Sequence, residues 1–171
     1  MFQIGDPAPD FLLSDLDGAS HHLKDFLGRI VILNFWSAEC LWVERVDREL
    51  LAYMQGWGER AILLPIAANL AESQEQIAAA VHARGLGRML RADRAALEAY
   101  AVQTTPQLFV IDALGLLRYR GAFDDVTFRQ RSPTHLYLKE AVERLLAGKT
   151  PDPAETPPYG CAVVRYFPDS C

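Results

Sequence analysis

The hydrophobic pattern of the chain is clearest between residues 31 and 57. Seven largely apolar residues from Val31 to Ser37 form one run. Because strands buried on both faces are continuously apolar rather than alternating, this run predicts a central strand. From Leu41 to Trp57 apolar residues recur near helical spacing with charged residues between them, which predicts an amphipathic helix. Cys40 therefore falls at the end of a central strand and the start of a helix.

The same reasoning places the other elements. Residues 61–67 form a second apolar run and predict a strand parallel to the first, since a helical connection between them requires that direction. Ser73 and Gln76 form a capping-box pattern that opens a helix over residues 73–84, and Gly85 ends it. The remaining pattern predicts a hairpin turning at residues 15–18, a brief strand at 89–90, a short helix at 94–100, an antiparallel pair at 107–112 and 116–120, and a last helix from His135 to Leu146, ended by Gly148.

Composition narrows the class of protein. The 171 residues are 50% hydrophobic and 23% charged, with a net charge of −5, which is ordinary for a soluble globular protein. The acidic balance argues against nucleic acid as a partner. The first six residues lack a signal-peptide pattern and no run reaches membrane-spanning length, so we expect a cytoplasmic protein with no membrane partner. We expect it to be a monomer or a homodimer. Four histidines without metal-ligand spacing predict no metal site, and we expect no other cofactor.

The position of Cys40 has a chemical consequence. Unpaired N–H groups and the helix dipole favour negative charge at a helix N-terminus, so a thiolate is stabilised there. We therefore expect the pKa of the Cys40 thiol to lie below the free value of about 8.5, with Glu39 and Glu44 opposing that shift. The alternative is a buried cysteine that acts as a small hydrophobic side chain.

Several motifs together resemble the redoxin branch of the thioredoxin superfamily, which includes peroxiredoxins and thiol-disulfide reductases. They are the Phe-Trp-Ser-x-x-Cys run that ends at Cys40 and the segments at residues 4–11, 23–29 and 104–112. The resemblance covers residues 1–148 and implies an α/β thioredoxin fold, with a central mixed sheet flanked by helices and an N-terminal hairpin. It also implies a cis bond at Pro106, which would place Thr105 beside Cys40, and a substrate-binding role for Thr105, Pro106 and Trp42.

The active-site motif departs from the family pattern in two ways. The run is Cys-Leu-Trp-Val, so Val43 stands where thioredoxin-like reductases carry the resolving cysteine. Peroxiredoxins carry a proline where this chain has Leu33, although Ser37 matches their hydroxyl position. Neither standard mechanism is therefore complete within the motif.

A tail at residues 149–171 forms a second part of the chain, after a single domain at 1–148. Four prolines between residues 151 and 158 favour an extended path. At about 3.3 Å per residue, this tail can carry Cys161 to any face of a small domain. It also resembles redoxin-like proteins that end in a Gly-Cys pair, which makes Cys161 a candidate resolving thiol. The alternative is that the tail only packs apolar residues onto the body, and the terminal Cys171 is the weakest thiol candidate.

Two functions follow from these observations. The first is a thiol oxidoreductase with antioxidant activity, in which Cys40 attacks a peroxide or a disulfide and is resolved by Cys161 or by an external thiol. A thioredoxin or a low-molecular-weight thiol would supply the electrons. The second is a binding module that lacks turnover and holds a partner in the groove beside Pro106.

Overall fold

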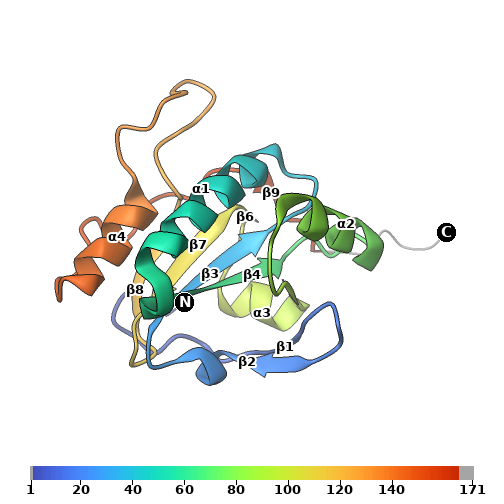
Figure 1. Cartoon of the computed structure of the whole chain (residues 1–171), viewed down its shortest axis with the longest axis horizontal. Coiled ribbons are helices and arrows are strands. Elements are labelled where there is room, and N and C mark those ends of the chain that lie inside the picture. The colour runs from blue at the N-terminus through green and yellow to red at the C-terminus, as the bar shows by residue number, and fades with distance from the viewer. Residues whose placement is uncertain (1, 166–171) are drawn as a thin grey trace.

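The computed structural model describes residues 2–165 and contains a five-stranded mixed sheet (Figure 1). Strands β3, β4 and β5 are parallel, whereas β7 and β8 run antiparallel to their neighbours. The order across the sheet is β5 (Leu90–Arg91), β4 (Ala61–Ala67), β3 (Ile30–Trp36), β7 (Gln107–Ile111) and β8 (Leu117–Gly121). Every residue of β3 is buried, as its continuous apolar run predicts.

Helices cover both faces of this sheet. Alternate residues of β3 face two separate apolar clusters, one on each side. Helices α1 (Leu41–Trp57) and α4 (Tyr137–Leu146) pack on one face, and α2 (Gln74–Arg84) lies beside α1. The short helix α3 (Arg94–Ala99) and the hairpin β1 (Leu12–Ser14) and β2 (Ser20–His22) cover the other face. This arrangement is the expected α/β thioredoxin fold.

The predicted boundaries are confirmed where local sequence determines them. Helix α2 is capped by the reciprocal bonds of Ser73 and Gln76, and it ends at Gly85, which adopts a left-handed conformation with φ of 65°. The strand expected at 89–90 lies one residue further on, at Leu90–Arg91. Two 3₁₀ turns, Leu23–Phe26 and Gly58–Arg60, were not predicted.

The prediction that the last helix starts at His135 was wrong by two residues. The backbone N–H groups of Thr134 and His135 donate to the carboxylate of Asp125, at 2.9 and 3.2 Å. Those bonds hold residues 134–135 in a loop, so α4 begins at Tyr137. The loop of residues 122–136 between β8 and α4 begins with the buried residues 122–124 and then projects away from the sheet (Figure 1).

The proline-rich tail runs along β8, the edge strand of the sheet, before it reaches the N-terminus of α1. Its Thr156 is buried, and the Thr156 hydroxyl lies 2.6 Å from the Tyr119 hydroxyl and accepts the Ala122 N–H at 3.0 Å. Beyond this anchor, β9 (Cys161–Ala162) pairs antiparallel with β6 (Thr104–Thr105), a two-stranded pairing that the sequence did not predict. The division into a domain ending at residue 148 and a separate tail stays a prediction. Within residues 2–165, no helix is long and apolar enough to span a membrane.

Candidate active site

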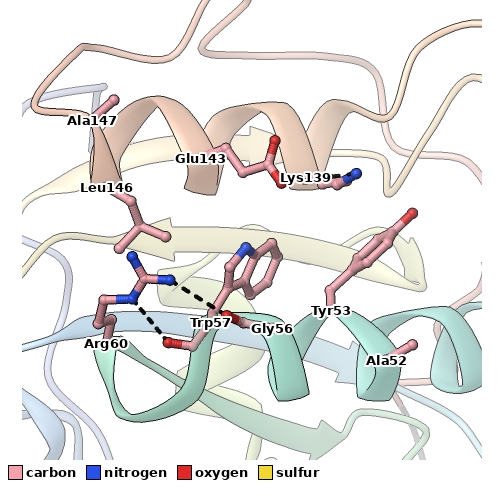
Figure 2. Close-up of a pocket in the computed structure, with 9 residues that line it drawn as sticks. All are labelled: Ala52, Tyr53, Gly56, Trp57, Arg60, Lys139, Glu143, Leu146 and Ala147. Carbon is pink, nitrogen blue, oxygen red and sulfur yellow. Dashed lines mark hydrogen bonds and ion pairs between the residues drawn. The ribbon is translucent and has the colours of Figure 1, made fainter.

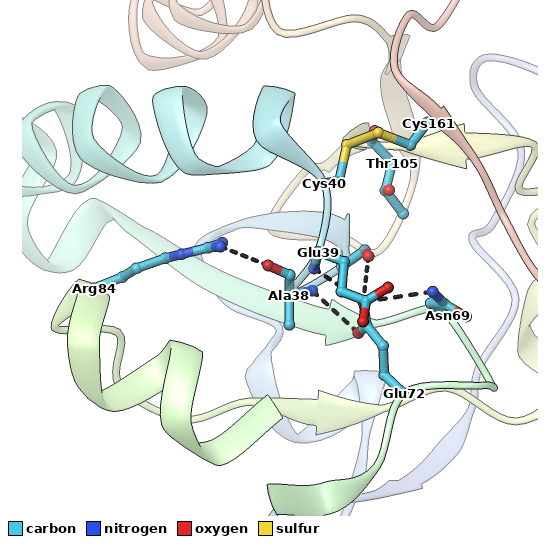
Figure 3. The surroundings of a disulfide bond; sticks show 9 residues. Ala38, Glu39, Cys40, Asn69, Glu72, Arg84, Thr105 and Cys161 are labelled. Atoms are coloured by element: carbon cyan, nitrogen blue, oxygen red, sulfur yellow. Dashed lines mark hydrogen bonds between the residues drawn. A yellow bond between two sulfur atoms is a disulfide. The ribbon is translucent and has the colours of Figure 1, made fainter. Parts of the chain in front are cut away.

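Cys40 is the N-cap residue of α1, as the strand–helix junction predicts. It is 2% exposed, and it forms a disulfide with Cys161 (Figure 3). The two Cα atoms are 6.0 Å apart, although 121 positions separate the residues in the sequence. The tail thus brings Cys161 to the sulfur of Cys40, as the length of the tail allows. Cys171 lies outside the residues that the structure describes.

The Thr105–Pro106 peptide bond is cis, as expected, and lies beside the disulfide. The sulfur of Cys40 is 3.1 Å from the carbonyl oxygen of Thr105, an acceptor to which a reduced Cys40 thiol can donate. Thr105 is also the register partner of Cys161 in the β6–β9 pair. The tail therefore occupies the groove beside Thr105 and Pro106 that the family resemblance associates with an incoming substrate.

Trp42, on the first turn of α1, contacts the tail through aromatic side chains. Its ring centroid lies 5.1 Å from that of Tyr159 and 5.1 Å from that of Phe128, both in edge-to-face geometry. The backbone N–H of Phe128 donates to the Tyr159 hydroxyl at 3.1 Å. These contacts join α1, the loop of residues 122–136 and the tail at the site. The substrate-binding role of Trp42 stays a prediction.

Glu72 holds the loop that leads into Cys40, and sequence reasoning missed it. This carboxylate is 3% exposed and accepts the Ser37 hydroxyl at 2.5 Å. It also accepts the backbone N–H groups of Ala38 and Glu39, both at 3.1 Å. Figure 3 shows Glu72 reaching this loop from the segment that follows β4. The sequence held a clue to this contact. Cys40 follows β3 and Glu72 follows β4, and the carboxyl ends of these two parallel strands lie at the same end of the sheet.

Arg84, the last residue of α2, fixes the same loop from another direction. Its guanidinium donates to the Ala38 carbonyl at 2.6 Å (Figure 3). It also donates to the Asp47 carboxylate at 3.2 Å. Asp47 also accepts the Trp36 indole N–H at 2.9 Å. Burial raises the pKa of Asp47, and the hydrogen bonds from Trp36 and Arg84 oppose that shift. The loop before Cys40 is thus held by its N–H groups on one side and by a carbonyl on the other.

Two further observations limit the chemistry of the site. Val43 is fully buried against Trp36 and Cys40, so the position of the missing cysteine is filled by a core side chain. Among residues 2–165, no group of three or more histidine, cysteine, aspartate or glutamate side chains is placed to hold a metal ion. The Cys40–Cys161 disulfide gives the site two sulfur atoms that can take part in redox chemistry.

A separate pocket lies between the C-terminal half of α1 and α4 (Figure 2). Tyr53, Trp57 and Lys139 line it. Its α1 residues begin at Ala52, twelve positions beyond Cys40, which is about 18 Å along a helix at 1.5 Å per residue. The pocket is therefore not part of the disulfide site.

Comparison with known proteins identifies the family. The sequence model of the AhpC/TSA family matches residues 4–120, which is more than half of the chain. The chain belongs to the AhpC/TSA family. The thiol-disulfide oxidoreductase ResA of Geobacillus thermodenitrificans is 35% identical to this family member over 120 residues, covering 67% of each protein. The match places the chain in the redoxin branch of the thioredoxin superfamily, as the motifs indicated.

Solved structures agree with this AhpC/TSA-family fold. A hypothetical protein from Sinorhizobium meliloti superposes with a TM-score of 0.86 at 28% identity, covering 97% of this chain and 96% of that one. The thioredoxin domain of a thiol-disulfide oxidoreductase from Bacteroides vulgatus gives a TM-score of 0.64 at 20% identity, over 77% of this chain and 94% of that one. The second likeness shows the fold alone.

Family membership and the Cys40–Cys161 disulfide together make this AhpC/TSA-family protein a thiol oxidoreductase. The structure gathers the five residues that the sequence singled out at one end of the sheet: Cys40, Trp42, Thr105, Pro106 and Cys161. Their individual roles in catalysis are part of the proposal below.

Proposed function

We propose that this protein catalyses thiol–disulfide exchange, with Cys40 as the nucleophile and Cys161 as the resolving thiol. The observation that carries the proposal is the disulfide between the N-cap of α1 and a strand held in the groove beside Pro106. A helix N-terminus favours the thiolate that exchange requires. The tail supplies the second sulfur that Val43 cannot.

The reaction proceeds in two exchange steps. The Cys40 thiolate attacks one sulfur of a substrate disulfide; the substrate S–S bond breaks, and one substrate thiolate leaves and takes a proton from water. The Cys161 thiolate then attacks the Cys40 sulfur of this mixed disulfide. The second substrate thiolate leaves, and the Cys40–Cys161 disulfide remains. Two electrons have passed from the enzyme to the substrate, and a thioredoxin or a low-molecular-weight thiol returns them by the reverse exchange.

Peroxide reduction, with an antioxidant role, is the second candidate, and the AhpC/TSA family match favours it. In that reaction the Cys40 thiolate attacks a peroxide oxygen, the O–O bond breaks, and the other oxygen leaves as water or an alcohol, which makes Cys40 a sulfenic acid. The sulfenic acid then condenses with the Cys161 thiol to the same disulfide and releases a molecule of water. Thiol–disulfide exchange is the better supported function, because Leu33 stands where peroxiredoxins carry proline and because the Ser37 hydroxyl donates its proton to Glu72. A binding module without turnover is the third outcome that an experiment can return.

Stopped-flow fluorescence of the reduced protein separates these functions, because Trp42 contacts the tail. We expect a protein disulfide to oxidise Cys40 and Cys161 at least about tenfold faster than hydrogen peroxide at equal concentration. The Cys40→Ser variant should show neither reaction. Faster oxidation by peroxide would favour the antioxidant function, and no oxidation by either reagent would leave the binding module.

A further inference from the structure

The tail strand fits the groove beside Cys40 because residue 160 is glycine. A Cβ atom on Gly160 would lie 2.0 Å from the carbonyl oxygen of Thr105 and 2.6 Å from its carbonyl carbon. Both are backbone atoms of β6, so no side-chain movement can relieve the overlap. Gly160 does not have a positive φ angle, so the requirement for glycine comes from close approach of two backbones.

The residue before this glycine is also recognised. Tyr159 packs against Trp42, and its ring centroid lies 6.4 Å from that of Phe128. Its hydroxyl accepts the Phe128 N–H, so both the aromatic face and the polar end of the side chain have partners. The groove therefore makes sequence-dependent contacts with the two residues that precede Cys161.

Residues 161–163 pair with the body of the protein through main-chain contacts that any extended segment can make. Cys161 and Ala162 pair with β6, and the Val163 N–H donates to the Gln103 carbonyl at 3.1 Å. Such strand addition gives affinity through main-chain hydrogen bonds, whereas selectivity for a sequence comes from the contacts of individual residues with the groove. In this groove the selective contacts lie at residues 159 and 160.

We propose that the groove is a binding site for an extended aromatic-Gly-Cys segment, and that the tail is its resident occupant. This inference rests on the proposed exchange activity and names its substrate class: disulfides of peptides or proteins in which one half-cystine follows an aromatic-Gly pair. A substrate strand and the tail occupy the groove in turn. The substrate strand enters while Cys40 is reduced, and it leaves β6 as Cys161 returns.

The test uses a full-length Cys161→Ser/Cys171→Ser variant, in which Cys40 is the only thiol. It is mixed with the pentapeptides Tyr-Gly-Cys-Ala-Val and Tyr-Ala-Cys-Ala-Val, each carrying thionitrobenzoate on its cysteine. Attack by Cys40 on the peptide sulfur releases thionitrobenzoate, whose absorbance gives the rate. We expect the glycine peptide to react about tenfold faster or more, because an alanine cannot approach Thr105. The symmetrical disulfide of two thionitrobenzoate groups, which carries no peptide, serves as the reference.

Equal rates for the two peptides, with reaction of the peptide-free disulfide, would overturn this inference and leave exchange activity standing. Failure of Cys40 to react with any of the three disulfides would overturn the proposed function itself.

The close approach of residue 160 to Thr105 also predicts how fast a variant of the tail closes onto Cys40. In a Cys171→Ser background, Gly160→Ala should slow closure of Cys161 onto a thionitrobenzoate-labelled Cys40 by about tenfold or more. Gly87→Ala is the matched control, because nothing lies within 4 Å of a Cβ atom at that position. Unchanged closure in Gly160→Ala would contradict the proposal.

Discussion

Replacing Cys161 with serine should stop turnover at a mixed disulfide between Cys40 and the substrate, lowering the steady-state rate about a hundredfold or more. The first exchange step needs only the Cys40 thiolate at the N-terminus of α1, so a single substrate thiol should still be released. The second step needs a sulfur beside Cys40, and in the wild-type structure the tail supplies it with Cα atoms 6.0 Å apart. Serine keeps the size of the side chain and removes only the nucleophile.

The measurement is a time course of thiol release with intact-protein mass spectrometry. The Cys161→Ser variant should release one equivalent of substrate thiol per chain and gain the mass of the other half of the substrate disulfide on Cys40. Cys171→Ser is the control, and it should turn over at the wild-type rate. Unimpaired turnover in Cys161→Ser would show that an external thiol resolves Cys40 and that the tail is structural.

Removing the Glu72 carboxylate should cost more stability than any substitution at an exposed glutamate. Glu72→Leu leaves the Ser37 hydroxyl and two backbone N–H groups without their acceptor, so we expect the free energy of unfolding to fall by about 2–4 kcal/mol. Glu72→Gln retains one acceptor oxygen and should lose less. Glu59→Gln, at an exposed position on the second 3₁₀ turn, should stay within about 0.5 kcal/mol of wild type in urea unfolding.

Glu72→Gln should also change the acidity of Cys40. The Glu72 carboxylate accepts the N–H of Glu39, the residue next to Cys40, and a nearby negative charge opposes thiolate formation. Removing that charge should therefore lower the pKa of the Cys40 thiol. Alkylation rates against pH, in the Cys161→Ser/Cys171→Ser background, measure this shift. A higher thiol pKa in Glu72→Gln would mean that Glu72 acts on Cys40 by positioning the loop rather than by its charge.

The sequence predicted those parts of the fold that short segments determine by themselves. A continuous apolar run is enough to identify β3, and helical spacing after it is enough to place Cys40 at a helix N-terminus. The Ser73 and Gln76 capping pair likewise acts within four residues. Such signals depend on neighbours along the chain, so they are visible in the sequence.

The parts that were missed depend on contacts between distant residues. Glu72 acts on Ser37, 35 positions away, and the Asp125 bonds that delay α4 cross about ten residues of loop. The length of the tail showed that Cys161 could reach Cys40, but not that it would pair with β6. That pairing depends on the backbone approach of Gly160 to Thr105, which the pattern of residue types does not encode.

A redox titration of the two cysteines tests whether Cys40 and Cys161 act as one redox-active pair. The full-length protein is equilibrated with a series of oxidised and reduced dithiothreitol ratios, quenched in acid, alkylated and mapped by peptide mass spectrometry. We expect Cys40 and Cys161 to lose their free thiols together, in one two-electron transition, and the linked Cys40–Cys161 peptide to accumulate over the same range. Independent titration of the two thiols, or a link from Cys40 to Cys171 in place of Cys161, would contradict this expectation.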